Sequence, residues 1–195
     1  MNRIRNILFP LAILAAVVLS IASCSSGDDS TWNEYAAWRE LNEDWLAEMA
    51  MKKLPDGSPE YTRVVPSWNE NAYVLMKWFN DTALTAGNLR PVYTSTVDVK
   101  YKGMRYNDEP FDSSYVNVQY GDSIFRSRLD RVIEGWAIAM ERMHVGDSVE
   151  VLIPYQQAYG AQIIGTKGTP NYLEPYSALK FGIKLVDVAG EYIRP

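Results

Sequence analysis

Three segments of the chain alternate apolar with charged or polar residues, and this alternation constrains the fold more than any other feature. Residues 97–102 read VDVKYK, residues 149–153 carry apolar side chains at every second position, and residues 179–185 set lysines between apolar neighbours. Successive side chains of a strand point to opposite faces, so each segment predicts a half-buried strand. Residues 72–79 also read as a strand, and strands with one solvated face are typical of antiparallel sheets.

A short helical pattern, VIEGWAIAMERMHVGD at residues 132–147, lies between two of these strands. Trp136, Met140 and Met143 share one face of the predicted helix, and Gly146 is suited to end it. We expect the methionines to pack in the core and Trp136 to reach the concave face of the sheet, as the floor of a pocket. The predicted fold class is α+β, a curved antiparallel sheet wrapped around a short helix.

An amphipathic helix is predicted upstream, over residues 31–51. Its apolar residues recur at three- and four-residue spacing, with Asn42 and several glutamates between them; they are Trp32, Tyr35, Trp38, Leu41, Trp45, Leu46 and Met49. The helix either docks on the chain's own domain, which we favour, or forms a dimer contact, and the oligomeric state stays open. We divide the chain into a helical extension over residues 31–63 and a globular domain over residues 64–195.

The first residues resemble the signal of a bacterial lipoprotein. Arg3 and Arg5 precede an apolar run over residues 7–22, which is short for a membrane-spanning helix and ends at Cys24 in a lipobox-like sequence, IASC. We therefore expect a signal peptide at residues 1–23, lipid on Cys24, and a tether at residues 24–30. The protein would then be anchored in the cell envelope, at the outer membrane facing the periplasm or at the cell surface. The alternative is a plain signal peptide with an incidental cysteine.

Composition argues against several classes of function. The formal net charge is −5, and no basic stripe is present to neutralise the phosphates of a nucleic acid. His144 is the only histidine and Cys24 the only cysteine, which argues against zinc sites and against Cys/His nucleophilic catalysis. No glycine-rich phosphate loop is found, so we expect no metal and no cofactor.

Six motifs, taken in order, resemble those of the FKBP-type peptidyl-prolyl isomerases. The order and most of the spacings are kept from residue 72 to residue 188. The motifs are VKYKGM at 99–104, PFDSS at 110–114, VIEGW at 132–136, MHVGD at 143–147, IP with AYG at 153–160, and LKF at 179–181.

The resemblance implies a five- to six-stranded sheet around a short helix, with a hydrophobic cleft between them. It implies Trp136 as the floor of a proline pocket, Asp112 at its polar rim, and a hydrogen bond from the Tyr159 hydroxyl to a substrate carbonyl. Leu173 takes the place of the family's apolar lip, beyond a loop at residues 161–172 that is longer than the family's. The implied catalytic residues are Tyr101, Phe111, Asp112, Trp136, Tyr159 and Phe181, and the implied substrate contacts are Phe125, Val132, Ile133 and Leu173.

The activity implied by this resemblance is peptidyl-prolyl cis-trans isomerisation, which would assist the folding of exported envelope proteins. Rotation about an X-Pro bond faces a barrier of ~18–20 kcal/mol, because twisting destroys amide resonance. The twisted amide is less polar than the planar one, so a dry aromatic pocket favours the twist, and only such differential binding accelerates the reaction. The resemblance also implies proline-containing polypeptides as partners and binding of macrolide inhibitors. The alternative is a chaperone or scaffold that binds proline segments in the same pocket without catalysis.

Overall fold

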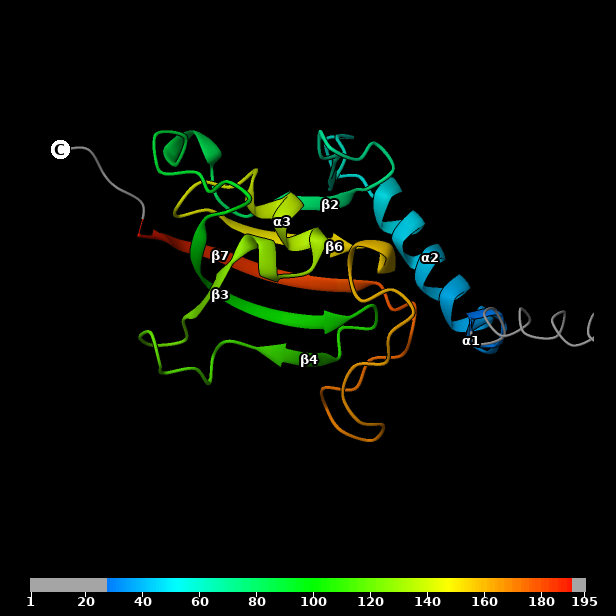
Figure 1. Ribbon diagram of the computed structural model, residues 1–195. Helices are drawn as coiled ribbons and strands as arrows, with labels where there is room; N and C mark the ends of the chain where they lie inside the picture. The colour runs from blue at the N-terminus through cyan, green and yellow to red at the C-terminus, as the bar shows by residue number, and fades with distance from the viewer. Residues whose placement is uncertain (1–27, 191–195) are drawn as a thin grey trace, which may run out of the picture. The chain divides into compact units, whose positions relative to one another are not determined.

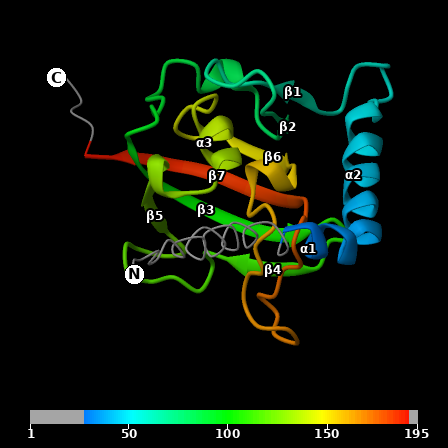
Figure 2. The same cartoon turned by 45° about the vertical axis from the view of Figure 1, so that its right-hand side comes forward.

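The computed structural model describes residues 28–190, and this part of the chain contains a curved antiparallel sheet of seven strands (Figure 1). The strand order is β1-β2-β6-β7-β3-β4, visible from top to bottom in Figure 2, and β5 also pairs with β3. The strands are β1 Thr62–Val64, β2 Val74–Trp78, β3 Thr96–Arg105, β4 Pro110–Ser113, β5 Phe125–Arg128, β6 Ser148–Ile153 and β7 Leu179–Ala189. The predicted fold class is confirmed. We expected five to six strands, and the described residues form seven.

The helices differ from the prediction in one respect. The helix expected over residues 31–51 is two helices, because Tyr35 between them leaves the helical conformation with ψ at 18°. The elements are α1 Asp28–Glu34, α2 Ala36–Met51 and α3 Glu134–Met140, with 3₁₀ turns η1 Thr82–Leu84, η2 Leu129–Arg131 and η3 Tyr155–Gln157. Helix α1 belongs to one compact unit, and all features below belong to a second, which begins at Tyr35. The predicted boundary between residues 63 and 64 falls inside β1.

The long pair β3 and β7 forms the middle of the sheet, with a register shift between Asp98 and Val99. Val97, Val99 and Tyr101 are buried as the alternation predicts, whereas Asp98, expected on the solvated face, is only 7% exposed. Arg126, which pairs with Asp98 from strand β5, donates two hydrogen bonds of 2.6 Å each to its carboxylate, so the buried carboxylate is neutralised by a guanidinium group at the surface.

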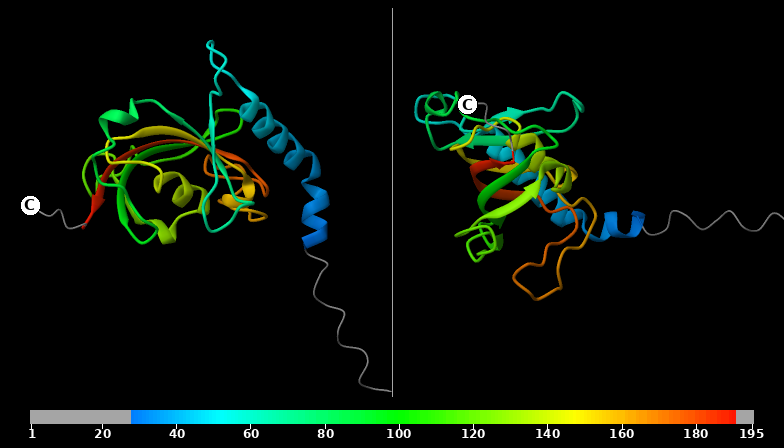
Figure 3. Two further views of the ribbon diagram at one scale, coloured as in Figure 1. Left: turned by 90° about the horizontal axis from the view of Figure 1, so that it is seen from above. Right: turned by 60° about the vertical axis from the view of Figure 1, so that its left-hand side comes forward.

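Helix α3 packs inside the curve of the sheet (Figure 3, left). Met140 and Met143 are fully buried, which confirms them as core residues. The expected end of the helix at Gly146 is wrong: α3 ends at Met140, and Gly146, with φ +99°, lies in the later turn that leads to β6. At the start of α3, a Cβ on Gly135 would lie 2.4 Å from Ile153, so only glycine lets α3 approach β6 this closely. The glycine before Trp136 therefore seats the indole deep against the sheet.

Helix α2 docks on the opposite face of the sheet. Its Leu46 packs in a second apolar cluster with Leu75 and Leu152, which point away from α3 because they alternate with residues of the main core. The predicted stripe is rotated: Leu41 is 45% exposed, whereas Asn42, expected on the polar side, is 1% exposed. The Asn42 amide is buried because it accepts a hydrogen bond from the backbone N–H of Ala178 (3.0 Å) and donates one to the carbonyl of Trp38 (2.8 Å).

We predict that Asn42→Ala lowers the free energy of unfolding by about 1–3 kcal/mol, because it leaves the buried N–H of Ala178 without an acceptor. Chemical denaturation measures the change. Glu48→Ala, on the exposed side of the same helix, serves as the matched control and should change stability by less than about 0.5 kcal/mol. Equal effects of the two substitutions would contradict the docking role of Asn42.

Candidate functional site

A cavity of about 210 Å³ opens where α3 meets the concave face of the sheet, and we call it the ring-lined pocket. Residues from β3, β4, β5, β7, the start of α3 and the turn after η3 surround it. Its lining residues are Tyr101, Asp112, Phe125, Arg131, Val132, Ile133, Trp136, Tyr159 and Phe181. Eight of the ten residues that the resemblance implied for the site are therefore brought together.

The indole of Trp136 is the centre of an aromatic cluster. It makes edge contacts with Tyr101 at 4.9 Å, Phe181 at 5.2 Å and Phe125 at 6.1 Å between ring centroids, each nearly perpendicular. Such edge-to-face packing is the favoured geometry for aromatic rings and holds the indole in place. Trp136 is 5% exposed and still lines the cavity, and its indole N–H has no hydrogen-bond partner among residues 28–190. The inner wall of the pocket is thus apolar apart from one unpaired donor.

Phe111 and Leu173 do not line the pocket. Phe111 is 8% exposed and packs against Phe181, with 5.6 Å between ring centroids, so it supports a ring of the wall from behind. Leu173, expected as an apolar lip, is 1% exposed and lies in the main core. Its backbone pairs with that of Ile164 through two hydrogen bonds, which turn the Leu173 side chain inward and close the base of the loop.

Gly103 makes room for the aromatic wall. A Cβ at this position would lie 2.8 Å from the Phe181 ring and 2.9 Å from the Phe111 ring, closer than van der Waals contact allows. Gly182, in the neighbouring strand β7, has nothing within 4 Å of an added Cβ. The two glycines offer a matched pair of positions in the same sheet.

We predict that Gly103→Ala destabilises the fold by about 1–3 kcal/mol through overpacking and slows any reaction in the pocket, because both rings must move. Gly182→Ala should leave stability and activity close to those of the unchanged chain. Thermal unfolding and a peptide assay measure the two effects. Equal behaviour of the two variants would show that the contacts of Gly103 do not shape the pocket.

At the polar rim, the Tyr101 hydroxyl is hydrogen-bonded within the protein and the Tyr159 hydroxyl is not. The Tyr101 hydroxyl donates to Asp112 at 2.6 Å, and the other carboxylate oxygen accepts the backbone N–H of Ser113 at 2.8 Å. Burial, together with the hydrogen bond to Asp112, raises the pKa of Tyr101 well above its ordinary value. Burial and then the charge of Asp112 also raise the pKa of Tyr159. Both phenols therefore stay protonated at neutral pH, and the Tyr159 hydroxyl has no protein partner in the described chain.

A second open donor belongs to the backbone of Ile133. Its carbonyl accepts the first hydrogen bond of α3, from the N–H of Trp136 at 3.0 Å, whereas its own N–H has no partner within residues 28–190. The unpaired N–H follows from its position, because the N-terminal amide groups of a helix have no intrahelical acceptor. The sequence provides no residue-specific signal for this donor.

Two arginines near the site were not identified from the sequence. Arg131 lines the pocket just before Val132. Arg105, at the end of β3, donates to the carbonyls of Pro170 (2.9 Å) and Tyr172 (2.5 Å) and so ties down the long loop over residues 161–172. The only signal for either residue is its place next to a strand end or helix start. Within residues 28–190, no group of three or more histidine, cysteine or carboxylate side chains is placed to hold a metal ion.

Comparison with known sequences identifies relatives of this domain. Residues 87–186 match the family described as FKBP-type peptidyl-prolyl cis-trans isomerase. Over 98 residues, half of this chain, the sequence is 37% identical to the peptidyl-prolyl cis-trans isomerase Mip of Coxiella burnetii and 36% identical to the isomerase FkpA of Escherichia coli. Those matches cover only 39% and 33% of the two relatives. FK506-binding protein 1 of Eremothecium gossypii is 32% identical over 104 residues, 83% of its length and 52% of this chain.

Solved structures give the same assignment. A peptidyl-prolyl cis-trans isomerase from Pseudomonas syringae matches with a TM-score of 0.58 and 25% identity, over 78% of this chain and 94% of that chain. FkpA from Escherichia coli matches with a TM-score of 0.59 over 82% of this chain and 63% of that chain, and at 23% identity this is a likeness of fold alone. From the matched sequence and the shared fold, the chain belongs to the FKBP-type peptidyl-prolyl cis-trans isomerase family.

Proposed function

We propose that the ring-lined pocket binds X-Pro segments of polypeptides and accelerates their cis-trans isomerisation. The observation that carries this proposal is a cavity with aromatic walls above Trp136, whose lining residues offer two unpaired donors, the Tyr159 hydroxyl and the Ile133 N–H, besides the indole N–H of Trp136. Membership of an isomerase family supports catalysis over mere binding of proline segments.

The pocket acts by differential binding of the twisted amide. The aromatic walls receive the pyrrolidine ring, and they exclude the water that stabilises the polar planar amide. Tyr159 and the Ile133 N–H hold substrate carbonyls on either side, so that the bond rotates within a fixed frame. Each 1.36 kcal/mol by which the twisted form is preferred gives about a tenfold gain in rate.

The individual residues contribute in different ways. Tyr101, Phe125, Trp136 and Phe181 form the walls, and Val132 and Ile133 form the side at the start of α3. Asp112 orients Tyr101 through the 2.6 Å hydrogen bond, Phe111 supports Phe181, and Leu173 anchors the loop. No proton transfer is needed, since an X-Pro bond rotates without a change in protonation. The rate should stay flat between about pH 6 and pH 9, because the raised pKa keeps the Tyr159 phenol protonated.

The rate of cis-trans exchange of an Ala-Leu-Pro-Phe peptide tests the proposal. We expect catalysis by the purified chain, a loss of roughly tenfold in kcat/KM for Tyr159→Phe, corresponding to ~1.4 kcal/mol, and inhibition by the macrolide FK506. Tyr115→Phe is the control, because Tyr115 is 61% exposed and does not line the pocket. Exchange no faster than in buffer, from folded protein, would remove the enzymatic function and leave a module that only binds proline segments.

We propose further that the protein is a lipoprotein of the bacterial cell envelope, anchored through lipid on Cys24, and that its clients are exported proteins. Cys24 and the leader lie outside the described residues. Within residues 28–190, no helix is both long enough and apolar enough to cross a membrane. The support is the IASC sequence at residues 21–24. Mass spectrometry of the mature N-terminus should find acyl chains on Cys24, and Cys24→Ser should move the protein from the membrane fraction to the soluble fraction.

A further inference from the structure

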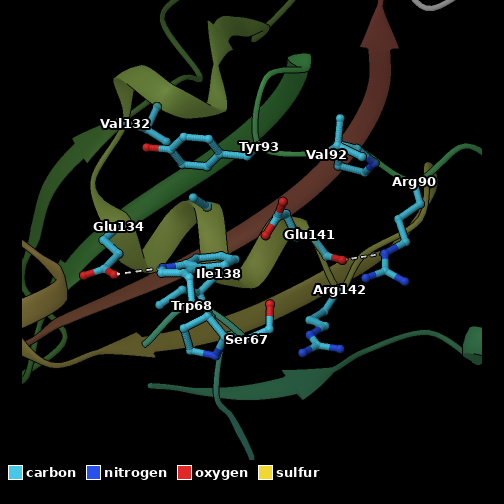
Figure 4. A pocket seen from close by; sticks show the side chains of 13 residues that line it. Ser67, Trp68, Arg90, Val92, Tyr93, Val132, Glu134, Ile138, Glu141 and Arg142 are labelled. Atoms are coloured by element: carbon cyan, nitrogen blue, oxygen red, sulfur yellow. Dashed lines mark hydrogen bonds between the residues drawn. The ribbon is translucent and has the colours of Figure 1, made fainter. Parts of the chain in front are cut away.

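A second, larger cavity of about 1130 Å³ lies on the outer flank of α3, between this helix and the segments at residues 66–68 and 90–93. Figure 4 shows it with Trp68 on one side, Tyr93 and Val92 on another, and with Ile138 of α3 and Glu141, which follows α3, between them. We call it the flank groove. None of its residues apart from Val132 belongs to the ring-lined pocket, and the isomerisation mechanism uses no other part of it.

Val132 lines both cavities, so the two adjoin at this residue. A polypeptide with its proline in the ring-lined pocket extends in both directions, and each extended residue advances the chain by about 3.3 Å. A client segment that leaves the pocket across Val132 therefore enters the flank groove within a few residues. Because the flank groove lies next to the ring-lined pocket, a polypeptide bound in the pocket can also contact the groove.

The walls of the groove expose large apolar side chains. Trp68 is 51% exposed, Tyr93 52% and Val92 58%, and the two rings lie 6.3 Å apart between centroids. Aromatic side chains of this kind supply much of the binding energy at protein interfaces. On the helix side, Ala137 and Ile138 are each 1% exposed and give the groove an apolar floor.

Hydrogen bonds hold the walls in place. The Trp68 indole donates to Glu134 at 3.3 Å, and Arg90 donates to the carbonyl of Glu141 at 2.5 Å (Figure 4). The Arg142 guanidinium donates to the carbonyl of Val65 at 3.3 Å. The groove is therefore formed before a ligand arrives, which reduces the entropy lost on binding.

The charges of the groove indicate which ligand fits. Two carboxylates, Glu134 and Glu141, and two guanidinium groups, Arg90 and Arg142, line it. A site for a polyanion, such as a nucleic acid or an acidic lipid surface, would be lined by cationic side chains alone. A polypeptide backbone presents N–H donors and carbonyl acceptors in alternation, and this matches a lining with acceptors and donors together.

We propose that the flank groove binds the client polypeptide beside the proline, as an extended unfolded segment with apolar or aromatic side chains that pack against Trp68 and Tyr93. This inference rests on the proposed function of the ring-lined pocket. The groove would act as a specificity subsite that lowers KM for long unfolded clients and leaves short peptides unaffected.

The test compares Ala-Leu-Pro-Phe with two longer peptides, which carry eight further residues rich in leucine and phenylalanine on the amino or the carboxyl side. We expect one longer peptide to show a KM at least tenfold lower than the tetrapeptide, with kcat little changed. Trp68→Ala combined with Tyr93→Ala should remove this advantage and leave kcat/KM for the tetrapeptide within twofold. Tyr93→Ala alone is the milder variant, since no hydrogen bond of the Tyr93 hydroxyl occurs within residues 28–190. Phe79→Ala, an aromatic residue 59% exposed outside both cavities, is the control and should have no effect.

Two results would overturn the inference. One is a KM that does not depend on peptide length, or an equal loss for short and long peptides. The other is an unchanged preference for long peptides together with conversion of a dimer to a monomer by the double variant in sedimentation equilibrium, which would make the groove a contact between copies of the chain. If the unchanged chain fails on the tetrapeptide, the proposed function of the pocket fails instead. Fluorescence anisotropy then measures how tightly the labelled long peptides bind to the unchanged chain and to the Trp68→Ala, Tyr93→Ala double variant, and this comparison tests the groove separately.

Discussion

Trp136→Ala is expected to lower kcat/KM for a prolyl tetrapeptide by roughly 100-fold, or about 2.7 kcal/mol, because it removes the floor of the pocket. The same change should lower the free energy of unfolding by about 3–5 kcal/mol, since the indole is 5% exposed and contacts three other rings. Peptide exchange and chemical denaturation measure the two losses.

Trp136→Phe separates activity from stability. It keeps a ring against Tyr101 and Phe181, removes the unpaired indole N–H, and should stay folded with intermediate activity. The activities of the two variants are compared at a temperature where circular dichroism shows both to be folded. Full activity in folded Trp136→Ala would mean that the aromatic floor is not required, and the proposed mechanism would then be wrong.

Asp147→Ala is the second substitution with a large expected effect, a loss of about 3 kcal/mol or more in the free energy of unfolding. Asp147 is 1% exposed and accepts three hydrogen bonds, from the backbone N–H of His144 (2.8 Å), the Thr85 hydroxyl (2.5 Å) and the Asn80 amide (2.9 Å). Alanine would leave these donors without an acceptor and loosen the turn between α3 and β6. Asp44→Asn, on the exposed surface of α2, is the control for loss of a carboxylate and should have little effect.

The contribution of Asp147 should also depend on pH. Burial by itself would raise its pKa, but the hydrogen bonds from His144, Thr85 and Asn80 outweigh burial and lower the pKa below the ordinary value of 3.8. A carboxyl group with a lowered folded-state pKa stabilises the fold above its unfolded-state pKa, and the contribution disappears as the pH falls through the folded-state value. The stability difference between the unchanged chain and Asp147→Asn should therefore be present at about pH 5 and shrink below about pH 4. A difference that grows on acidification would contradict the lowered pKa.

The regular strands and the helix of the domain were predictable because their patterns repeat. Strands β3, β6 and β7 extend over six or more residues, enough for an alternation to be recognised, and α3 lies where its apolar face predicted it. Strands β1, β4 and β5 have only three or four residues, too few to establish a period. Their places are set by pairing: β4 and β5 both pair with the long strand β3, and β1 pairs with β2.

Some residues of the candidate site were also predictable from the sequence, and others were not. Tyr101, Trp136 and Phe181 could be assigned through motifs that keep their order in the family, and the structure brings them around one cavity. Leu173 could not be placed, because its direction depends on how the long loop pairs with itself at Ile164. The open N–H of Ile133 and the flank groove also could not be assigned from residue types. The N–H is a backbone group left open at the start of a helix, and the groove forms where separate segments of the chain meet.

The sequence by itself determined the class of fold, the strands and helix that form the core, and the aromatic residues that could make a pocket, because local periodicity and motif order depend only on neighbours along the chain. The tertiary structure alone decided that Asn42 and Asp98 are buried, that Phe111 stands behind the wall, and that Trp68 and Tyr93 come together in the lining of one groove. Each of these depends on a partner far away in the chain, such as Ala178 for Asn42 or Arg126 for Asp98. The free energy of burying a polar group is set by that partner, and no local pattern contains it.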